Sequence, residues 1–350
     1  MIKPRPPLPR LRVPRRPRPW VPPRRPWRNA VTVCIAAIAT GLVKGDKKDK
    51  EIPVIVGASD RMVSALDIGY ERPQSKISRI TPFIVALSAG NDAVQAEVLS
   101  RTESHFQTEL ANNPRWFPVE EVADKYSQNL VTYLREAIER TILEPVGLNW
   151  DTYMSSHPDR HPLWFEERRK EVFEDYPPST ETIVAGVDES GAHIFEVNRD
   201  GLVVRRDRAA FATIGSGYRH AESQFMFEGH SPSKSYPDTL FLTYVAKRRA
   251  EVAPGVGKDT DLFTISLRGG YVELQEELDT FKKVYDSILR KGEEERAELK
   301  LKILDTMEKT QELRKAKYTK LWEEKIRKWT DSGKLEDSPF FQPPKNTPTK

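Results

Sequence analysis

The order of hydrophobic periods along the chain is the feature that most constrains its fold. Segments with the alternation and β-branched content of strands come first, and two segments with the period of amphipathic helices follow. The same succession then repeats and ends on a further pair of strands. Each half alone would leave an apolar face bare. The order therefore predicts an α+β protein in which two antiparallel sheets pack together and helices cover both outer faces.

The expected elements are short and separated by turn residues. We expect strands over residues 32–39, 54–59, 62–65, 76–80, 83–88, 182–187, 193–198, 202–205, 209–214, 261–267 and 271–274. We expect helices over residues 92–111, 119–143, 218–227 and 237–252. The charged stretch 44–51 is typical of a hairpin connection, and a turn at Ala89-Gly90-Asn91 precedes the first helix.

The first thirty residues differ in composition from everything that follows. Residues 1–30 hold nine arginines, one lysine and no acidic residue, and ten prolines lie within 1–29. They carry +10 of a net charge of +4, which leaves −6 for the rest of the chain. Such a segment has few apolar residues to bury, and its prolines oppose helix and strand, so we predict a disordered leader. It lacks the apolar region of about 7–15 residues that a secretory signal contains.

Three interpretations of this leader stay open: a basic polyproline arm that binds nucleic acid or an anionic surface, a propeptide, and translated sequence upstream of the true start. We favour the third, because the composition changes abruptly at Val31 and valine codons can serve as bacterial starts. Initiation there, followed by removal of methionine, would leave Thr32 as the first residue. The remainder is mildly acidic, which argues against a general nucleic-acid surface on the globular part.

Three segments fall outside the pattern of strands and paired helices. Residues 145–180 combine prolines and aromatic residues around a charged stretch at 162–173, which predicts an insertion with one short helix. Residues 276–330 are charged and helical in pattern, and we weigh equally an appendage on its own subunit and a helix that braces a partner or an oligomer. Residues 331–350 are expected to be disordered. The main domain is therefore expected over 31–275.

Two features of composition bear on where such a chain works. No run approaches the ~18 apolar residues of a membrane span, so we predict a soluble protein without membrane contact. Cys34 is the one cysteine, which excludes an internal disulfide framework and suits a reducing cytoplasm.

Four residues stand at the ends of the first strand segments, and their spacing points to a known family. Asp60 precedes Lys76 by sixteen residues, and Lys76 precedes Gly90 by fourteen. With this spacing, the stretches TVCIAAIA from Thr32, GASDRMVSA, SKISRI and ALSAGND resemble the β-type subunits of the proteasome and their bacterial relatives. Those proteins are N-terminal nucleophile hydrolases with a four-layer αββα sandwich. The resemblance covers residues 31–276, and the charged loop 44–51 accounts for a longer interval before Asp60.

The resemblance implies a role for each of these residues. Thr32 would be the nucleophile, and its own free α-amino group, which titrates at about 7.7–8.0, would be the base. Lys76 would lower the pKa of that amine and stabilise the hydroxyl oxygen as it becomes negative, while Asp60 would hold Lys76 charged and oriented. The backbone N–H of Gly90 would donate to the developing oxyanion. The implied reaction is acyl transfer, most simply hydrolysis of a peptide bond.

A further match and two departures concern the later part of the chain. Ser216, in Gly215-Ser216-Gly217, corresponds to a family serine near the terminal amine, although it can equally cap the following helix. The family carries an Asp and a Ser before its last core strands, and the nearest positions here are Ala253 and Val256, with Glu251 and Asp259 adjacent. Self-processing subunits usually carry glycine before the threonine, where this chain has Val31. Reduced or absent activity is therefore an open alternative.

The remaining candidate residues are weaker indications of a functional site. Cys34 is expected on the same side of its strand as Thr32, more as a small buried residue than as a second nucleophile. His157 and His161 lie four residues apart, but Pro158 and Pro162 break the helix that would align them, so we predict no metal site. We expect no cofactor, and find no phosphate-binding glycine loop.

The sequence thus favours a cytoplasmic, proteasome-like threonine peptidase subunit that cleaves peptides or unfolded proteins after Thr32 is exposed. It predicts a homo-oligomer, in a ring or a stack, with an unidentified ATPase as a possible partner. Two rivals remain: an inactive scaffold subunit of the same fold, and a protein whose basic arm binds nucleic acid, which we consider the weakest of the three.

Overall fold

The computed structural model describes residues 32–43, 50–65, 68–113, 115–155 and 180–295, with single positions at 298, 309, 316, 317, 320, 324 and 327. The chain divides into two compact units, Met1–Leu278 and Asp279–Lys350. All the strands and helices named below belong to the first unit.

The first sheet has five antiparallel strands in the order β10-β1-β2-β11-β12. They are β1 (Cys34–Val43), β2 (Lys50–Asp60), β10 (Phe211–Ile214), β11 (Thr260–Ser266) and β12 (Gly270–Glu273). The pairing of β1 with β2 runs from Cys34 opposite Ser59 to Val43 opposite Lys50, so the predicted hairpin is confirmed.

The second sheet also has five antiparallel strands, in the order β5-β6-β7-β8-β9. They are β5 (Ile77–Thr81), β6 (Ile84–Gly90), β7 (Thr180–Asp188), β8 (Gly191–Val197) and β9 (Val203–Arg205). A separate two-stranded ribbon pairs β3 (Met62–Ala65) with β4 (Ile68–Glu71).

Strand alternation divides the apolar side chains between two kinds of layer. Cys34, Ala36 and Ile38 of β1 belong to the core between the sheets, together with side chains of β2, β6, β7, β8, β10 and β11. Val33, Ile35 and Ala37 belong instead to a cluster with residues of α5 and α6. Because successive side chains of a strand point to opposite faces, one short apolar strand serves both cores.

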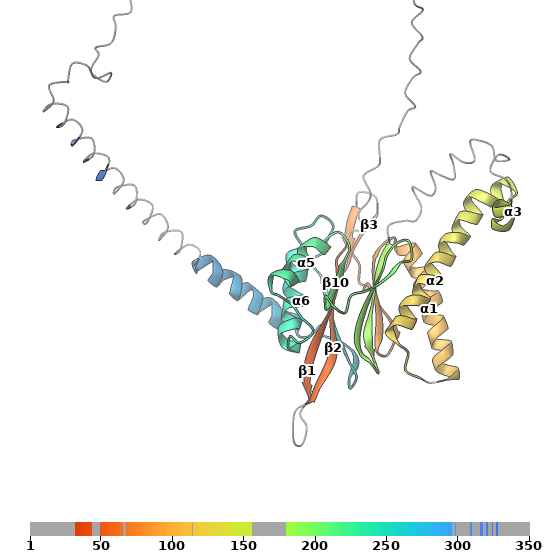
Figure 1. Cartoon of the computed structure of the whole chain (residues 1–350), viewed down its shortest axis with the longest axis horizontal. Coiled ribbons are helices and arrows are strands. Elements are labelled where there is room, and N and C mark those ends of the chain that lie inside the picture. The colour runs from red at the N-terminus through yellow and green to blue at the C-terminus, as the bar shows by residue number, and fades with distance from the viewer. Residues whose placement is uncertain are drawn as a thin grey trace, which may run out of the picture. The chain divides into compact units, whose positions relative to one another are not determined.

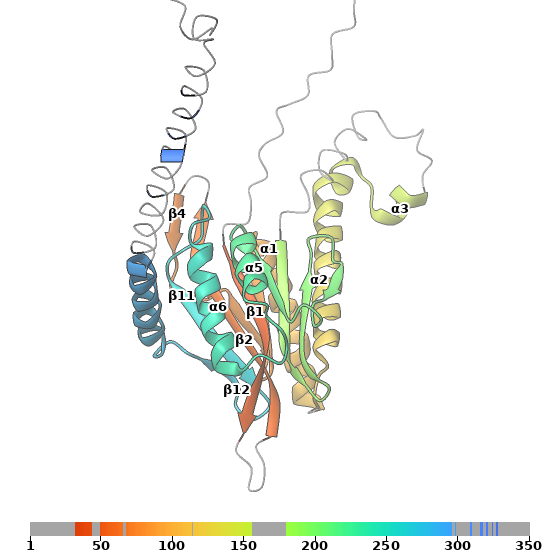
Figure 2. The same ribbon diagram turned by 60° about the vertical axis from the view of Figure 1, so that its left-hand side comes forward.

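Two helices cover the outer face of each sheet (Figures 1 and 2). Helices α5 (Tyr218–Phe227) and α6 (Tyr236–Ala250) lie on the first sheet, and their buried residues share a cluster with β1 and β10. Helices α1 (Asp92–Asn112) and α2 (Val119–Ile138) lie on the second, where Val98, Phe106 and Tyr126 pack against β5 to β8. A π-helical turn (η1, Glu139–Leu143), a 3-10 turn (η2, Glu144–Val146) and α3 (Trp150–Ser155) follow α2.

Local signals account for several helix starts. Asn91 caps α1, because its side chain accepts from the N–H groups of Ala93 and Val94. Ser235 caps α6 by accepting from Asp238, and a proline occupies the first turn of that helix. Pro118 precedes α2 and supplies no side-chain cap; the Asp188 carboxylate accepts from Val119 N–H instead, at 2.9 Å.

The observed elements match most of the expected ones, with boundaries that differ by a few residues. The mixed α and β class with antiparallel sheets is confirmed. The first strand was expected at Thr32, but β1 begins at Cys34 and continues to Val43. The helix expected to Leu143 ends at Ile138, because its last turn widens to the π form. The ribbon strand β4 was not expected, since residues 68–71 show no strand alternation bounded by turn signals.

Several expectations fall on residues that the structure does not describe. The leader 1–30, the short helix at 162–173 and the tail 331–350 lie outside the described residues. In the second unit, residues 279–295 are helical, as expected for the start of the 276–330 extension. Among the helices of the described ranges, none is long and apolar enough to cross a membrane.

Candidate active site

Thr32 lies immediately before β1, and the turn after β10 encloses its backbone. The Thr32 N–H donates to Ser216 Oγ at 3.3 Å, and the Gly217 N–H donates to the Thr32 carbonyl oxygen at 3.2 Å. Gly215 has φ +87°, and a Cβ there would overlap that same carbonyl oxygen. The Gly-Ser-Gly turn therefore needs its first glycine in order to hold Thr32 at the end of the sheet.

The Thr32 hydroxyl lies between a lysine and an aspartate. It donates to Asp60 Oδ1 and accepts from Lys76 Nζ, and Lys76 Nζ donates to the same Asp60 oxygen at 2.9 Å. All three residues are buried, at most 7% exposed. The structure thus brings Thr32, Lys76 and Asp60 together, as the family resemblance led us to expect.

The Asp60 carboxylate accepts five hydrogen bonds, which fix it at the end of β2. Oδ1 accepts from the Thr32 hydroxyl, from Lys76 and from Val33 N–H, the last at 3.0 Å. Oδ2 accepts from Gly257 N–H at 2.8 Å and from Met62 N–H at 3.3 Å. A buried charge is tolerated when its lone pairs are satisfied in this way, and its orientation is then set by the fold.

This arrangement holds the Thr32 hydroxyl between Lys76 and Asp60, but the intact chain has no free α-amino group at Thr32 to act as the base. An ammonium against the oxygen stabilises the negative charge that develops when the hydroxyl attacks a carbonyl. The nitrogen of Thr32 is an amide when residue 31 is attached, and its lone pair is delocalised into the peptide bond. Cleavage before Thr32 would turn it into an amine beside Ser216.

Gly90 ends β6 with φ +119°. Two residues earlier on that strand, the Ser88 carbonyl accepts from Cys34 Sγ at 3.5 Å, so the end of β6 lies beside the start of β1. Among the described contacts, none joins Gly90 to Thr32. Its role as an oxyanion donor therefore stays a prediction.

Cys34 is fully buried, and burial raises the pKa of its thiol to about 12. A thiol with that pKa is protonated at neutral pH and is a poor nucleophile. These data favour the interpretation of Cys34 as a small core residue.

The positions nearest to the Asp and Ser that the family resemblance implies are apolar. Ala253 and Val256 are buried in the cluster beneath α5 and α6. Glu251 pairs with Lys247 at 2.8 Å. A hydrogen bond between their side chains links Asp259 to Glu71 and raises the pKa of Asp259. Both carboxylates are thus engaged with other side chains.

Three residues that support the site were not expected from the sequence. Glu71, on the unexpected strand β4, accepts from Lys258 N–H and from Asp259 N–H, the latter at 3.1 Å. Glu181 Oε2 accepts from Gly215 N–H at 3.1 Å, and Lys247 is buried behind the loop that joins α6 to β11. A lysine on the inner face of an otherwise amphipathic helix is the one signal that could have found Lys247.

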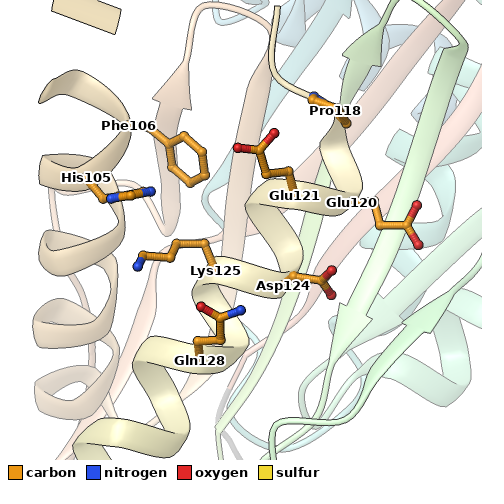
Figure 3. Close-up of a pocket in the computed structure, with 8 residues that line it drawn as sticks. All are labelled: His105, Phe106, Pro118, Glu120, Glu121, Asp124, Lys125 and Gln128. Atoms are coloured by element: carbon orange, nitrogen blue, oxygen red, sulfur yellow. The ribbon is translucent and has the colours of Figure 1, made fainter. Parts of the chain in front are cut away.

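A cavity of about 470 Å³ lies between α1 and α2 and includes none of the predicted site residues (Figure 3). Its lining residues are His105, Phe106, Pro118, Glu120, Glu121, Asp124, Lys125 and Gln128. Two of its acids already have cationic partners, since Arg205 pairs with Glu120 and Arg115 with Glu121. We do not assign the chemistry to this cavity, because none of its lining residues carries a hydroxyl or a thiol.

Within the described ranges, no group of three or more His, Cys, Asp or Glu side chains is arranged to hold a metal ion, and His157 and His161 lie outside those ranges.

A scan against protein-family models finds no match for the chain, and a search of curated proteins finds none either.

Proposed function

We propose that this protein is an N-terminal nucleophile hydrolase of the proteasome β type, a threonine peptidase whose nucleophile is the Thr32 hydroxyl. The observation that carries the proposal is the buried cluster in which that hydroxyl contacts both Lys76 Nζ and Asp60 Oδ1. Neither a helix cap nor a surface ion pair requires a threonine, a lysine and an aspartate to converge at less than a tenth exposure.

The fold supports the same proposal. Two five-stranded antiparallel sheets with a helix pair on each outer face correspond to the αββα layers that the family resemblance implies. The nucleophile at the start of β1 and the acid at the end of the paired strand β2 meet at one end of the first sheet.

The proposed reaction begins with Thr32 as the first residue. Its amine, through a water, takes the hydroxyl proton, and the oxygen attacks the substrate carbonyl carbon. Lys76 stabilises the oxygen while it is negative, and the Gly90 N–H donates to the oxyanion. Collapse breaks the peptide bond, the leaving amine takes the proton, and a water then hydrolyses the ester that joins the acyl group to Thr32.

A scaffold of the same fold without activity is the second candidate. It is favoured by one observation, namely that the positions nearest to the family Asp and Ser are the buried apolar residues Ala253 and Val256. Under either candidate we propose a cytoplasmic homo-oligomer, which light scattering of the purified chain would detect.

A peptide epoxyketone distinguishes these candidates, because its two carbons react with two groups of one residue. The threonine oxygen adds to the ketone, and the free amine of the same residue then opens the epoxide. A chain that begins Met-Thr32 and loses its methionine should gain the whole mass of the reagent. The matched Thr32→Ala chain should gain nothing.

The full chain, with its leader attached, should also stay unlabelled, because its Thr32 nitrogen is an amide. Protein made in its native host should begin at Thr32. Activity towards peptides with the leader still attached would overturn the threonine mechanism. Absence of labelling in a folded chain that begins at Thr32 would favour the scaffold.

A further inference from the structure

Lys247 is a buried cation that the proposed reaction does not use. It lies in the last turn of α6, and its side chain is completely buried. Its ammonium has three N–H donors and three acceptors: Glu251 Oε1 at 2.8 Å, the Gly257 carbonyl at 3.0 Å and the Lys258 carbonyl at 2.8 Å. Two of the three acceptors are backbone oxygens of the loop between α6 and β11.

That loop, residues 252–259, contacts both sides of the candidate site. The Gly257 N–H donates to Asp60 Oδ2 at 2.8 Å. The Pro254 carbonyl oxygen is 3.2 Å from Ser216 Oγ, and Ser216 Oγ accepts from the Thr32 nitrogen. One loop therefore borders the carboxylate that orients Lys76 and the hydroxyl beside the future amine.

We propose that Lys247 is a positioning residue of this site: by holding the carbonyls of Gly257 and Lys258, it fixes the loop whose N–H orients the Asp60 carboxylate. The inference rests on the proposed function for its effect on acylation.

The free-energy cost of burying the Lys247 ammonium favours a role in fixing this loop over general stabilisation of the fold. Burial lowers the pKa of Lys247 and Glu251 opposes that shift, so the charge is held at a cost. An apolar residue of similar volume would often be as stable at such a position. A lysine whose one task was to complement the helix C-terminus could stay at the surface, as Arg249 does on the same turn.

The test compares two lysine-to-methionine changes in the full chain. Lys247→Met removes the buried ammonium, and Lys258→Met removes an exposed one from the same loop while keeping its backbone groups. Amide hydrogen exchange is followed at Gly257 and at Val33, since both N–H groups donate to Asp60. We expect Lys247→Met to speed exchange at both amides by about tenfold or more, and Lys258→Met to leave both unchanged.

The same two changes are then made in the chain that begins at Thr32. Lys247→Met should lower the maximal rate of acylation by about tenfold, with little change in the reagent concentration at half-maximal rate, because it misplaces groups without removing a binding contact. Lys258→Met should stay within about twofold of the parent.

Unchanged exchange at Gly257 in a folded Lys247→Met chain would overturn the proposal. Faster exchange at Gly257 alone, with Val33 exchange and acylation unchanged, would also overturn it and leave Lys247 as a loop anchor. If the parent chain itself is not acylated, the proposed function fails, while the exchange comparison still decides whether Lys247 orders Asp60.

A second variant covers the case in which Lys247→Met does not fold. A Cβ at Gly257 would lie 2.6 Å from Glu71 Oε1 and 3.0 Å from Met62 Cβ. Gly257→Ala therefore displaces the loop from its other side and leaves the Lys247 side chain in the protein. It should speed exchange at Val33 as well, and a folded Gly257→Ala chain with unchanged Val33 exchange would contradict the proposal.

Discussion

Two clusters in this molecule place a hydroxyl, a basic nitrogen and a carboxylate within hydrogen-bonding distance. One is the buried site of Thr32, Lys76 and Asp60. The other lies at the β7–β8 hairpin, where Ser190 Oγ is 2.7 Å from His193 Nε2, and His193 Nδ1 is 2.7 Å from Asp207 Oδ2. By distance alone, the hairpin has the more familiar set of residues, since serine, histidine and aspartate form a known catalytic triad.

The hairpin cluster contains a fourth residue, Asp188, on the hydroxyl itself. Asp188 Oδ1 accepts from Ser190 Oγ at 2.7 Å and lies 3.4 Å from His193 Nε2. A serine hydroxyl has one proton, so it cannot serve Asp188 and His193 together. The His193 ring lies between two carboxylates, since Nδ1 faces Asp207 and Nε2 faces Asp188. Ser190 is also exposed, whereas Thr32 is buried.

Short distances alone therefore do not identify a nucleophile. At Thr32 the hydroxyl has one donor and one acceptor, and each is held by further bonds from the fold. At Ser190 the hydroxyl proton also goes to a carboxylate, Asp188 Oδ1, but among the described contacts no ammonium donates to the oxygen, and the side chain is exposed. Changes at Lys76, Asp188 and Ser190 test this difference, and we expect effects of decreasing size in that order.

The largest effect is expected at Lys76. In the chain that begins at Thr32, Lys76→Ala should lower acylation by the peptide epoxyketone about a thousandfold, because the charge that stabilises the attacking oxygen is gone. Intact mass against time gives the rate. Labelling at the parent rate would remove Lys76 from the mechanism.

Stability needs a separate control here, because a lone buried carboxylate costs about 3–5 kcal/mol. The double change Lys76→Met with Asp60→Asn removes both charges together. It should fold, as judged by circular dichroism, and should be equally inert.

An intermediate effect is expected at Asp188, which joins the hairpin to the start of α2. Asp188→Ala should lower the free energy of unfolding by about 1 kcal/mol at pH 7, because Val119 N–H loses its acceptor. Chemical denaturation of the parent and the variant measures the difference. Acylation of Thr32 should be unaffected, which would separate the two clusters.

This difference should depend on pH. Burial would raise the pKa of Asp188, but hydrogen bonds from Ser190 and from Val119 N–H outweigh burial and lower it below its usual 3.8. A carboxyl whose folded pKa is lowered stabilises the protein above its unfolded pKa and loses that contribution as pH falls through the folded one. The gap between parent and variant should thus be constant above about pH 5 and shrink below about pH 4. A gap that persists undiminished under acid would contradict this account.

The smallest effect is expected at Ser190. Ser190→Ala should leave acylation of Thr32 unchanged within about twofold and stability within about 0.5 kcal/mol, as for an exposed side chain. A fluorophosphonate that reacts with activated serines should not label the parent chain at Ser190. Labelling that disappears in Ser190→Ala would show that Asp188 does not capture the hydroxyl proton and that the hairpin is a second nucleophilic centre.

The local sequence pattern predicts much of this architecture. Period-two and helical stripes predict the order of strands and helices, because side-chain periodicity follows directly from backbone geometry. The interval of sixteen positions from Asp60 to Lys76 spans β3, β4 and the approach to β5, and the structure shows that it brings the lysine back to the aspartate. The side chains of the site can therefore be identified individually from the sequence.

The backbone groups and side chains that hold these site residues in place cannot be identified from the sequence in that way. Gly257 reaches Asp60 across 197 residues, and Ser216 reaches Thr32 across 184. The groups that Lys247 and Glu71 hold are backbone carbonyls and N–H groups, which every residue except proline carries in full. The sequence shows which residues carry a carboxylate, because it specifies the side chains. Several hundred backbone groups are chemically identical, so only the folded path of the loop decides which of them donates to that carboxylate.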